Sequence, residues 1–482
     1  MKRLIVLLVC SIWVITGWAI DNRLEKSVSA NLTYTDNIGL RSTNEKSGFI
    51  VSVTPNMSLH REAARSNIDL VAALEINSQN EGGENFNPRL QFDSNWELFE
   101  DHFFLDLNAT AAQNSSDPFT STSINSVNSS GDVATTYDLE ISPYFINRFR
   151  RYADLEVRYT RDKQINKGSV TNGSTSDIIN ISLNSGEAFS RVFWGLNYTK
   201  DEISSEQTTD SNFESYNATI GFALNRSWRI NGSVGVENND FTSTRSSNDG
   251  DTWGVDVVWS PSPRTSLTVG YEDRFFGGSP TLDFEHRFRR SAINLSYSKQ
   301  VTNSTRLLRN QQVFQIVDQF GNPIINPASG NPFLVSSNLA TLNDVTFIDE
   351  RLDGSYSYQG RRSNITWNIS HSRQSDETGV SGGSSSTLFD TGLTYTRELS
   401  RKNSLNTSIQ FNQTEQGTLS GTNDSDRHQF NIGLSHQLDQ NSSIDINYSY
   451  SKQDSDNALV ATTTRNEYTE NRLTLGFSHQ FK

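Results

Sequence analysis

Histidines beside serines are the first residue types with which this chain could catalyse a reaction. Its seven histidines are His60, His102, His286, His371, His428, His436 and His479. None has the spacing of a zinc-binding helix such as H-E-x-x-H. His371 has Ser370 and Ser372 as neighbours, but adjacent residues of an extended strand point to opposite faces, so the imidazole cannot activate either hydroxyl. The histidines therefore predict neither a metal site nor a hydrolase.

Paired acids are the second such feature, and they lie in polar segments. Asp376 precedes Glu377, and Asp424 lies two residues before Asp426. A surface protease could use such carboxylates, but segments this rich in Ser, Asn and Asp produce acid pairs through composition alone. We therefore expect no enzyme, no catalytic residue, no metal ligand and no cofactor.

A further set of charged residues lies inside runs that alternate between apolar and polar residues. Each member falls on the polar face of its run: Asp69, Glu75, Asp106, Asp154, Glu156, Arg158, Glu237, Asp256, Glu272 and Asp445. Charged side chains are costly against lipid but tolerated in the wet interior of a membrane barrel, so we predict that these residues line such an interior. An acidic wall would favour cations or neutral sugars and repel polyanions. The alternative is that these charges only hydrate and brace the wall.

The hairpin at residues 352–372 illustrates the element that must position these charges. The apolar face of its first arm carries Leu352, Gly354, Tyr356 and Tyr358, and that of its second arm carries Ile365, Trp367 and Ile369. Side chains of a strand alternate between two faces, so each arm has one apolar and one polar face. The same pattern recurs from Ser27 to the last residue and predicts about 22 strands, within a range of about 18 to 24.

The connectors between these strands alternate between short and long. Short turns lie near residues 148–151, 261–264 and 360–363, and longer polar loops lie near 114–132, 238–250 and 452–465. A soluble sandwich has no reason to keep this alternation, whereas a transmembrane barrel has short periplasmic turns and long extracellular loops. We predict an all-β fold, a transmembrane antiparallel up-and-down β-barrel that forms one domain over residues 20–482.

Composition agrees with this prediction. Hydrophobic residues make up only 34% of the 482 residues and the formal net charge is −14, yet the chain has 8 Trp, 15 Tyr and 27 Phe. Disordered chains are poor in aromatic residues. A barrel with a wet interior needs apolar residues on only half of each strand. The acidic balance, without a continuous basic patch, argues against a nucleic-acid partner.

The two ends of the sequence predict where the chain goes. Lys2 and Arg3 precede an apolar run to Ile15, which is typical of a signal peptide over residues 1–19. The single cysteine, Cys10, lies inside it; a lipoprotein cysteine is the less favoured alternative. The last run alternates up to Phe481, which resembles the signal read by the outer-membrane insertion machinery. We predict location in the outer membrane of a Gram-negative cell after cleavage, in contact with its lipid.

The long connector at residues 303–343 interrupts the strand pattern. It contains three Asn-Pro pairs, which initiate turns and block strands, and its aromatic residues include Phe314, Phe320 and Phe333. Loops of this length are commonly functional or disordered. One hypothesis is a lid or inward constriction whose phenylalanines contact a ligand; the other is a mobile extracellular loop.

Several short motifs resemble one family. The stretch from Leu32 to Leu40 (LTYTDNIGL), that from Phe49 to Pro55 (FIVSVTP), residues 58–65 and residues 351–362 are similar to outer-membrane barrels associated with the PEP-CTERM/exosortase and exopolysaccharide system. The resemblance implies a location in the outer membrane and an association with exopolysaccharide or surface-protein sorting. It implies no reaction and no catalytic residue.

These features predict a non-enzymatic, porin-like conduit for a neutral or weakly charged polymer or solute, linked to exopolysaccharide export. The alternative is a scaffold that anchors surface-sorting machinery and conducts nothing. Periplasmic polysaccharide-export components are the expected partners. Basic residues in the short turns could meet anionic headgroups or a periplasmic partner, or could simply be solvated: Arg150, Arg151, Arg289, Arg290, Arg361 and Arg362.

Overall fold

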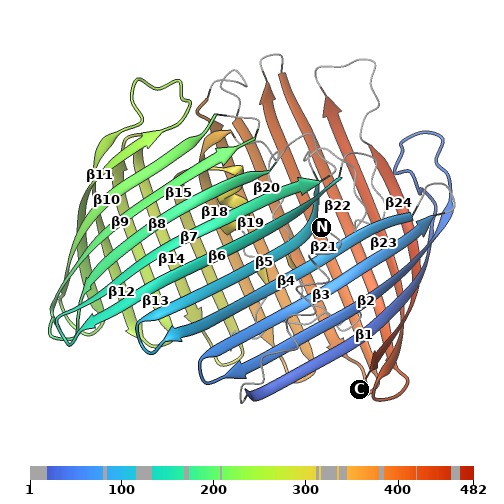
Figure 1. The fold of residues 1–482 in the computed structure, drawn as a ribbon. Coiled ribbons are helices and arrows are strands. Elements are labelled where there is room, and N and C mark those ends of the chain that lie inside the picture. The colour runs from blue at the N-terminus through green and yellow to red at the C-terminus, as the bar shows by residue number, and fades with distance from the viewer. Residues whose placement is uncertain are drawn as a thin grey trace.

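The computed structural model forms a closed antiparallel barrel of 22 strands, which confirms the predicted fold class and strand number (Figure 1). It describes residues 19–79, 84–115, 133–167, 173–206, 209–310, 314–315, 334–335, 345–378, 385–418, 421–457 and 467–481. The expected signal peptide falls almost wholly outside these residues. Each wall strand pairs with its neighbours in sequence, β15 pairs with β18, and β24 pairs with β1 to close the wall.

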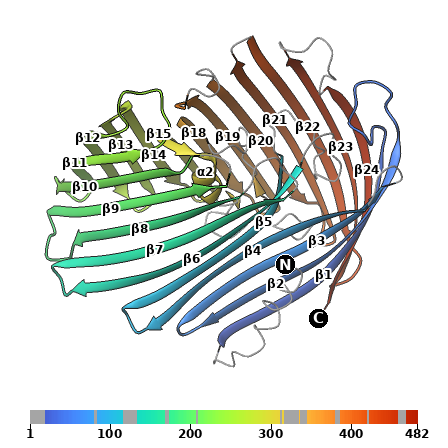
Figure 2. The ribbon, with the colours of Figure 1, turned by 45° about the horizontal axis from the view of Figure 1, so that its top comes forward.

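The wall strands are for the most part longer than the roughly 9–11 tilted residues that cross a bilayer. They are β1 (Ala19–Thr35), β2 (Gly48–Ala63), β3 (Ser66–Gln79), β4 (Glu84–Phe99), β5 (Phe103–Ser115), β6 (Val133–Phe149), β7 (Ala153–Lys167), β8 (Ser174–Ser185), β9 (Val192–Ser205), β10 (Ser211–Ala223), β11 (Trp228–Asp240), β12 (Gly250–Ser262), β13 (Thr265–Arg274), β14 (Gly277–Arg287), β15 (Ser291–Asn303), β18 (Thr346–Gln359), β19 (Ser363–Asp376), β20 (Ser385–Glu398), β21 (Asn403–Thr418), β22 (Gly421–Gln437), β23 (Ser442–Asn457) and β24 (Tyr468–Phe481). Figure 2 shows that these strands are strongly tilted.

The two faces of the wall have opposite chemistry. Large apolar side chains such as Ile220, Val234 and Trp253 are more than half exposed on the outer face, at 62%, 63% and 52%. Among the described residues, buried polar side chains outnumber buried apolar ones. This arrangement reverses that of a soluble protein and matches a barrel whose outer face meets lipid. In the described part of the chain, no helix is both long and apolar enough to cross a membrane.

The seam between the first and last strands is held by polar contacts as well as by the backbone ladder. Residues Lys26 to Thr35 of β1 pair in register with Phe481 to Arg472 of β24. Thr33 Oγ1 lies 2.9 Å from Thr474 Oγ1, and Thr35 donates a hydrogen bond of 2.7 Å to Glu470. Closure pairs the first strand with the last, so the wall lacks the two open edges of a flat sheet. β1 begins and β24 ends at the rim with the short turns.

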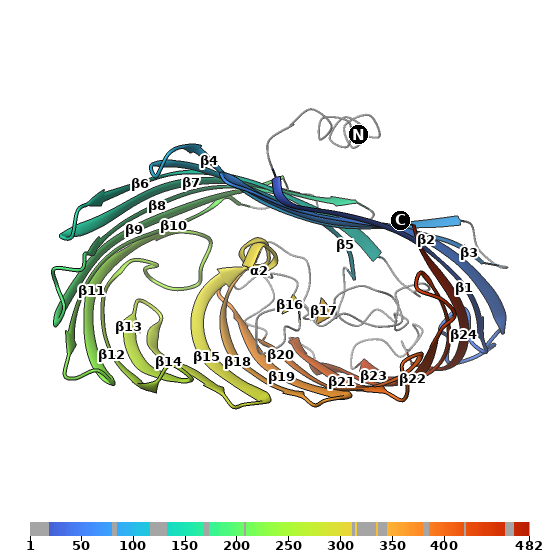
Figure 3. The same ribbon diagram turned by 90° about the horizontal axis from the view of Figure 1, so that it is seen from below.

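The end of β15 and the start of β18 leave the cylindrical wall. β14 pairs with β15 only from Leu282↔Tyr297 to Arg287↔Ala292, while β15 and β18 remain paired as far as Asn303↔Thr346. From there the helix α2 (Ser304–Asn310) and the short strands β16 (Phe314–Gln315) and β17 (Leu334–Val335) lie within the ring of wall strands (Figure 3). The described parts of the long connector thus fold inward.

An apolar cluster stabilises this inward turn. Val301 and Ile348, a register pair of β15 and β18, are 5% and 7% exposed. They cluster with side chains from the strands and connectors opposite: Ile203, Phe213, Phe241 and Phe276. Burial of six large apolar residues favours the bent arrangement, since each contributes roughly 1.5–3 kcal/mol relative to exposure. The cluster therefore ties β15 and β18 to the wall at β9 and β10.

Candidate functional site

The ten charged residues predicted to line the interior all share the polar face of their strands. On β7, for example, Glu156 and Arg158 alternate with Val157 and Tyr159, which are 37% and 39% exposed on the outer face. The same parity separates Glu237 from the exposed Val236 on β11. Whether this face conducts a solute remains a prediction.

Four of the nine acids in this set form ion pairs with three arginines. Arg89 pairs with Glu75 at 2.9 Å, and Arg274 pairs with Glu237. Two others bind neutral or titratable groups: Asp69 lies 2.5 Å from His60 Nδ1, and Asp256 accepts a hydrogen bond of 2.6 Å from Asn231. The described wall is therefore closer to electrical balance than the list of acids suggested. Arg89 and Arg274 were not foreseen, because their pairing with acids of other strands depends on the register.

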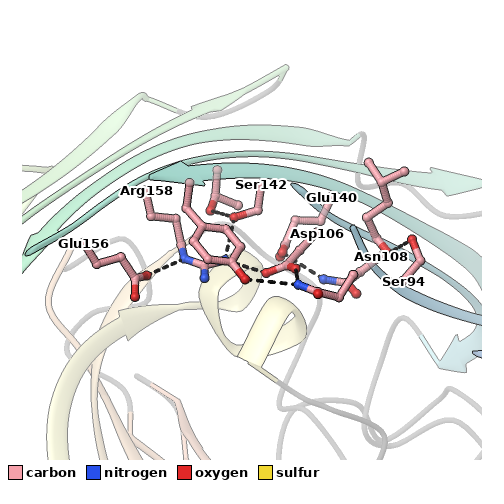
Figure 4. A network of polar contacts seen from close by, with 11 residues as sticks. Ser94, Asp106, Asn108, Glu140, Ser142, Glu156 and Arg158 are labelled. Carbon is pink, nitrogen blue, oxygen red and sulfur yellow. Dashed lines mark hydrogen bonds and ion pairs between the residues drawn. The ribbon is translucent and has the colours of Figure 1, made fainter. Parts of the chain in front are cut away.

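Arg158 is the centre of the most extensive contacts on this wall (Figure 4). Its guanidinium donates hydrogen bonds to Asp106 of β5 at 2.7 Å, to Ser142 of β6 at 3.1 Å and to Glu156 of its own strand at 2.9 Å. Glu140, on the same side, accepts a hydrogen bond of 3.0 Å from Asn108. These contacts bring together three of the predicted residues, of which Asp106 lies 52 positions before Arg158 in the sequence.

A stack of planar groups accompanies this network. Phe104, Tyr144 and Arg158 are cross-strand neighbours on β5, β6 and β7. The rings of Phe104 and Tyr144 lie 5.1 Å apart with an interplanar angle of 13°, and the Arg158 guanidinium carbon lies 3.8 Å from the Tyr144 centroid. Tyr144 Oη accepts a hydrogen bond from Asn95. The stack fixes Arg158 in place, because a cation over an aromatic face is attracted by the ring quadrupole.

Helix α2 is held against the wall opposite β15. Its Arg309 donates a hydrogen bond of 2.7 Å to Asp201 of β9, and Arg306 Nε lies 3.2 Å from the same carboxylate, which is 2% exposed. Arg306 also lies over the ring of Phe213 at 4.5 Å. Thr305 Oγ1 lies 3.0 Å from Ser174 Oγ of β8. These contacts place a cationic helix inside the barrel.

Asn303 is the residue that starts helix α2. Asn303 Oδ1 accepts a hydrogen bond of 2.9 Å from the backbone N–H of Arg306, the arrangement of an N-cap. Such a cap stabilises the first turn by about 1 kcal/mol. The strand β15 can therefore end and the helix begin at a single residue.

A second tie crosses the rim with the long connectors. Arg245, between β11 and β12, forms a bidentate ion pair with Glu377, just beyond β19. The backbone N–H of Thr244 donates a hydrogen bond of 2.8 Å to Glu377 O. The Glu377 carboxylate raises the pKa of Arg245 above its ordinary value. The connector after β11 is thus joined to the end of β19, six strands beyond β11 along the wall.

The other candidate residues are not brought into a site. Phe314 lies in β16, whereas Phe320 and Phe333 lie outside the described residues, so the predicted aromatic constriction stays a prediction. His371 points to the outer face beside Phe389, with ring centroids 6.5 Å apart. Within the described ranges, no group of three His, Cys, Asp or Glu residues could hold a metal ion.

Comparison with known proteins identifies a fold and no family. No protein-family model matches the sequence, and no curated protein matches it. Solved structures do match. The siderophore receptor PirA from Acinetobacter baumannii has a TM-score of 0.52 and 9% identity, with 96% of this chain and 81% of that chain covered. The FrpB iron transporter from Neisseria meningitidis (F5-1 variant) has a TM-score of 0.51 and 10% identity, with 96% and 83% covered. This likeness shows the outer-membrane barrel fold alone, and the exopolysaccharide-associated family stays a resemblance of motifs.

Proposed function

We propose that this barrel is a passage through the outer membrane for a neutral or weakly charged solute or polymer, and that helix α2 sets its aperture. The observation that carries the proposal is the buried contact of α2 with the inner wall, where Arg306 and Arg309 share the carboxylate of Asp201. A helix fastened inside a polar ring narrows whatever path the ring encloses.

The charge of the described wall supports the choice of solute. Acids such as Asp106, Glu156 and Glu75 have arginine partners, so a passing molecule would meet offset charges and many amide and hydroxyl groups. Neutral polyhydroxylated molecules can form hydrogen bonds with such groups. Because they carry no charge, they do not need a wall of unbalanced charge to attract them. The motif resemblance to exopolysaccharide-associated barrels is the reason for including a polymer of sugars in this proposal.

A scaffold is the second candidate. The ends of β15 and β18 turn inward and are fixed there by the apolar cluster around Val301 and Ile348. Such an internal support would suit a barrel that conducts nothing. In that case the outer rim would serve only to hold surface machinery.

The conduit is tested with mature protein refolded into planar bilayers and into sugar-loaded liposomes. We expect stable unit conductance and swelling with small neutral sugars. Arg309→Gln removes the closer of the two cations that share Asp201, while Arg306 stays 3.2 Å from the same carboxylate. Because Asp201 keeps one cation, the cost should lie below the roughly 3–5 kcal/mol of a fully unpaired buried charge. The docked helix should lose about tenfold in its equilibrium constant, which corresponds to about 1.4 kcal/mol, and unit conductance should rise.

The matched control is Arg161→Gln, whose guanidinium lies on the outer face 3.6 Å from Asp177. It should leave conductance unchanged. A folded wild-type barrel that is electrically silent and excludes sugars would favour the scaffold. Equal conductance in the wild type and in Arg309→Gln would contradict an aperture set by α2.

A further inference from the structure

The rim with the short turns is strongly basic in an acidic protein. The ten short connectors, from 64–65 between β2 and β3 to 438–441 between β22 and β23, contain twelve Lys or Arg and four Asp or Glu, a net charge of +8. The whole sequence has a net charge of −14. Positive charge is therefore concentrated at one end of the barrel.

Most of this charge stands in exposed pairs. Four connectors carry adjacent basic residues: Arg150–Arg151, Arg289–Arg290, Arg361–Arg362 and Arg401–Lys402. All eight side chains belong to exposed residues, and none takes part in an ion pair with another described residue. By contrast, Arg65 on the same rim pairs with Glu100 at 2.8 Å. Lys402 donates a hydrogen bond of 3.3 Å to Leu438 O, and the seven arginines are available to an outside anion.

Exposed apolar residues flank the same pairs. Phe149 and Tyr152 are 47% and 63% exposed beside Arg150 and Arg151, Phe288 is 49% exposed beside Arg289, and Leu399 is 49% exposed near Arg401. Aromatic residues at the ends of the outer band of a barrel lie at the boundary of the hydrocarbon layer. The basic residues in the turns therefore lie at the level of the headgroups, directly beside the outer surface of the wall.

We propose that these turns bind phosphate-bearing anionic lipid headgroups of the leaflet that surrounds the short-turn rim. Guanidinium groups match phosphate oxygens in bidentate geometry, so paired arginines suit this ligand. The basic pairs are spread over the turns from β6–β7 to β20–β21, which a continuous annulus of lipid contacts more readily than one docked protein. The proposal does not depend on passage of a solute.

The distribution of charge confines the binding to an arc. The three turns that flank the β1–β24 seam, β2–β3, β4–β5 and β22–β23, carry Arg65 against Glu100, Asp101 and Asp439, a net charge of −2. These carboxylates repel phosphate. Retained anionic lipid should therefore lie along the arc and not at the seam.

Native mass spectrometry of the detergent-solubilised full barrel tests the proposal, with phosphatidylglycerol and phosphatidylcholine titrated separately. We expect the wild type to retain more phosphatidylglycerol, with the excess falling as salt rises. Each basic residue near an anionic surface is worth about fivefold in binding. The quadruple variant R289Q/R290Q/R361Q/R362Q should therefore lose the excess by at least about tenfold. Arg65→Gln, on the same rim beside the seam, should keep it.

Two outcomes would overturn the proposal. One is equal retention of both lipids by the wild type, or an excess of phosphatidylglycerol that survives in a folded quadruple variant. The other is arginine-dependent binding of soluble polyglutamate from the aqueous side without preference for phosphatidylglycerol, which would assign the arc to an acidic protein. Heat-dependent mobility in gels establishes that each variant retains the closed barrel.

Discussion

Arg158 shows how one residue can decide the electrical character of the inner wall. It pairs with both Asp106 and Glu156, which offsets one of their two negative charges, and it is held over the ring of Tyr144, so its charge stays beside the acids. At the surface such pairs contribute at most about 1 kcal/mol to stability. Here their effect on a passing ion is the more important consequence, because the interior of a barrel concentrates the field of its charges.

We therefore predict that Arg158→Gln makes the passage more selective for cations. The amide preserves hydrogen bonding to Ser142 but leaves two carboxylates without their cation. Reversal potentials in a potassium chloride gradient should shift towards the potassium value, by several millivolts or more. Lys200→Gln is the control, because Lys200 lies on the outer face opposite Ile179 and pairs there with Glu202 at 2.6 Å. An unchanged reversal potential would mean that ions do not pass Arg158.

At the scale of the element, close packing between strands limits which side chains the wall accepts. A Cβ added at Gly235 of β11 would lie 2.4 Å from the backbone oxygen of Tyr216, which cannot move without disturbing β10. A Cβ added at Gly232 of the same strand would meet nothing closer than 3.9 Å. Close packing against β10 thus requires a glycine at position 235, whereas position 232 has room for a larger side chain.

We predict that Gly235→Ala destabilises the barrel by about 1–3 kcal/mol, as overpacking does, whereas Gly232→Ala is neutral or slightly stabilising. Urea titration of protein refolded into liposomes, followed by tryptophan fluorescence, would measure the difference. Equal midpoints for the two variants would contradict the close approach of β10 and β11.

The strands also mark the limit of what the sequence could predict. Alternation placed the ten charged residues on one face, since polarity with period two needs no knowledge of neighbours. Val301 and Ile348 have the same parity as the outward-facing residues of β15 and β18, yet the structure buries both. Their strands turn inward because Phe213 and Ile203, some 90 positions away or more, offer an apolar surface there. Contacts between distant segments do not appear in a local pattern, and the same is true of Arg309 with Asp201.

At the scale of the whole molecule, a rigid wall encloses a separate inward segment. The wall is closed by the β1–β24 ladder, whereas α2 is joined to it by a few side-chain contacts from one short helix. A helix of this length has little stability of its own. Of the two parts, α2 is therefore the one that can detach without opening the barrel.

Two engineered disulfides, one at α2 and one at the seam, test the helix and the wall separately. Ser174→Cys with Thr305→Cys would link α2 to β8, where the native hydroxyl oxygens are 3.0 Å apart. Thr33→Cys with Thr474→Cys would link the two strands of the seam, where the oxygens are 2.9 Å apart. After removal of the predicted signal peptide the chain has no other cysteine, because Cys10 is the only one in the sequence.

We expect oxidation of the first pair to lower the conductance or the open fraction, with recovery on reduction, because a tethered helix cannot leave the path. Oxidation of the second pair should change neither quantity, since the seam is already closed. If both oxidised variants conduct like their reduced forms, α2 is a fixed part of the wall and the aperture does not vary.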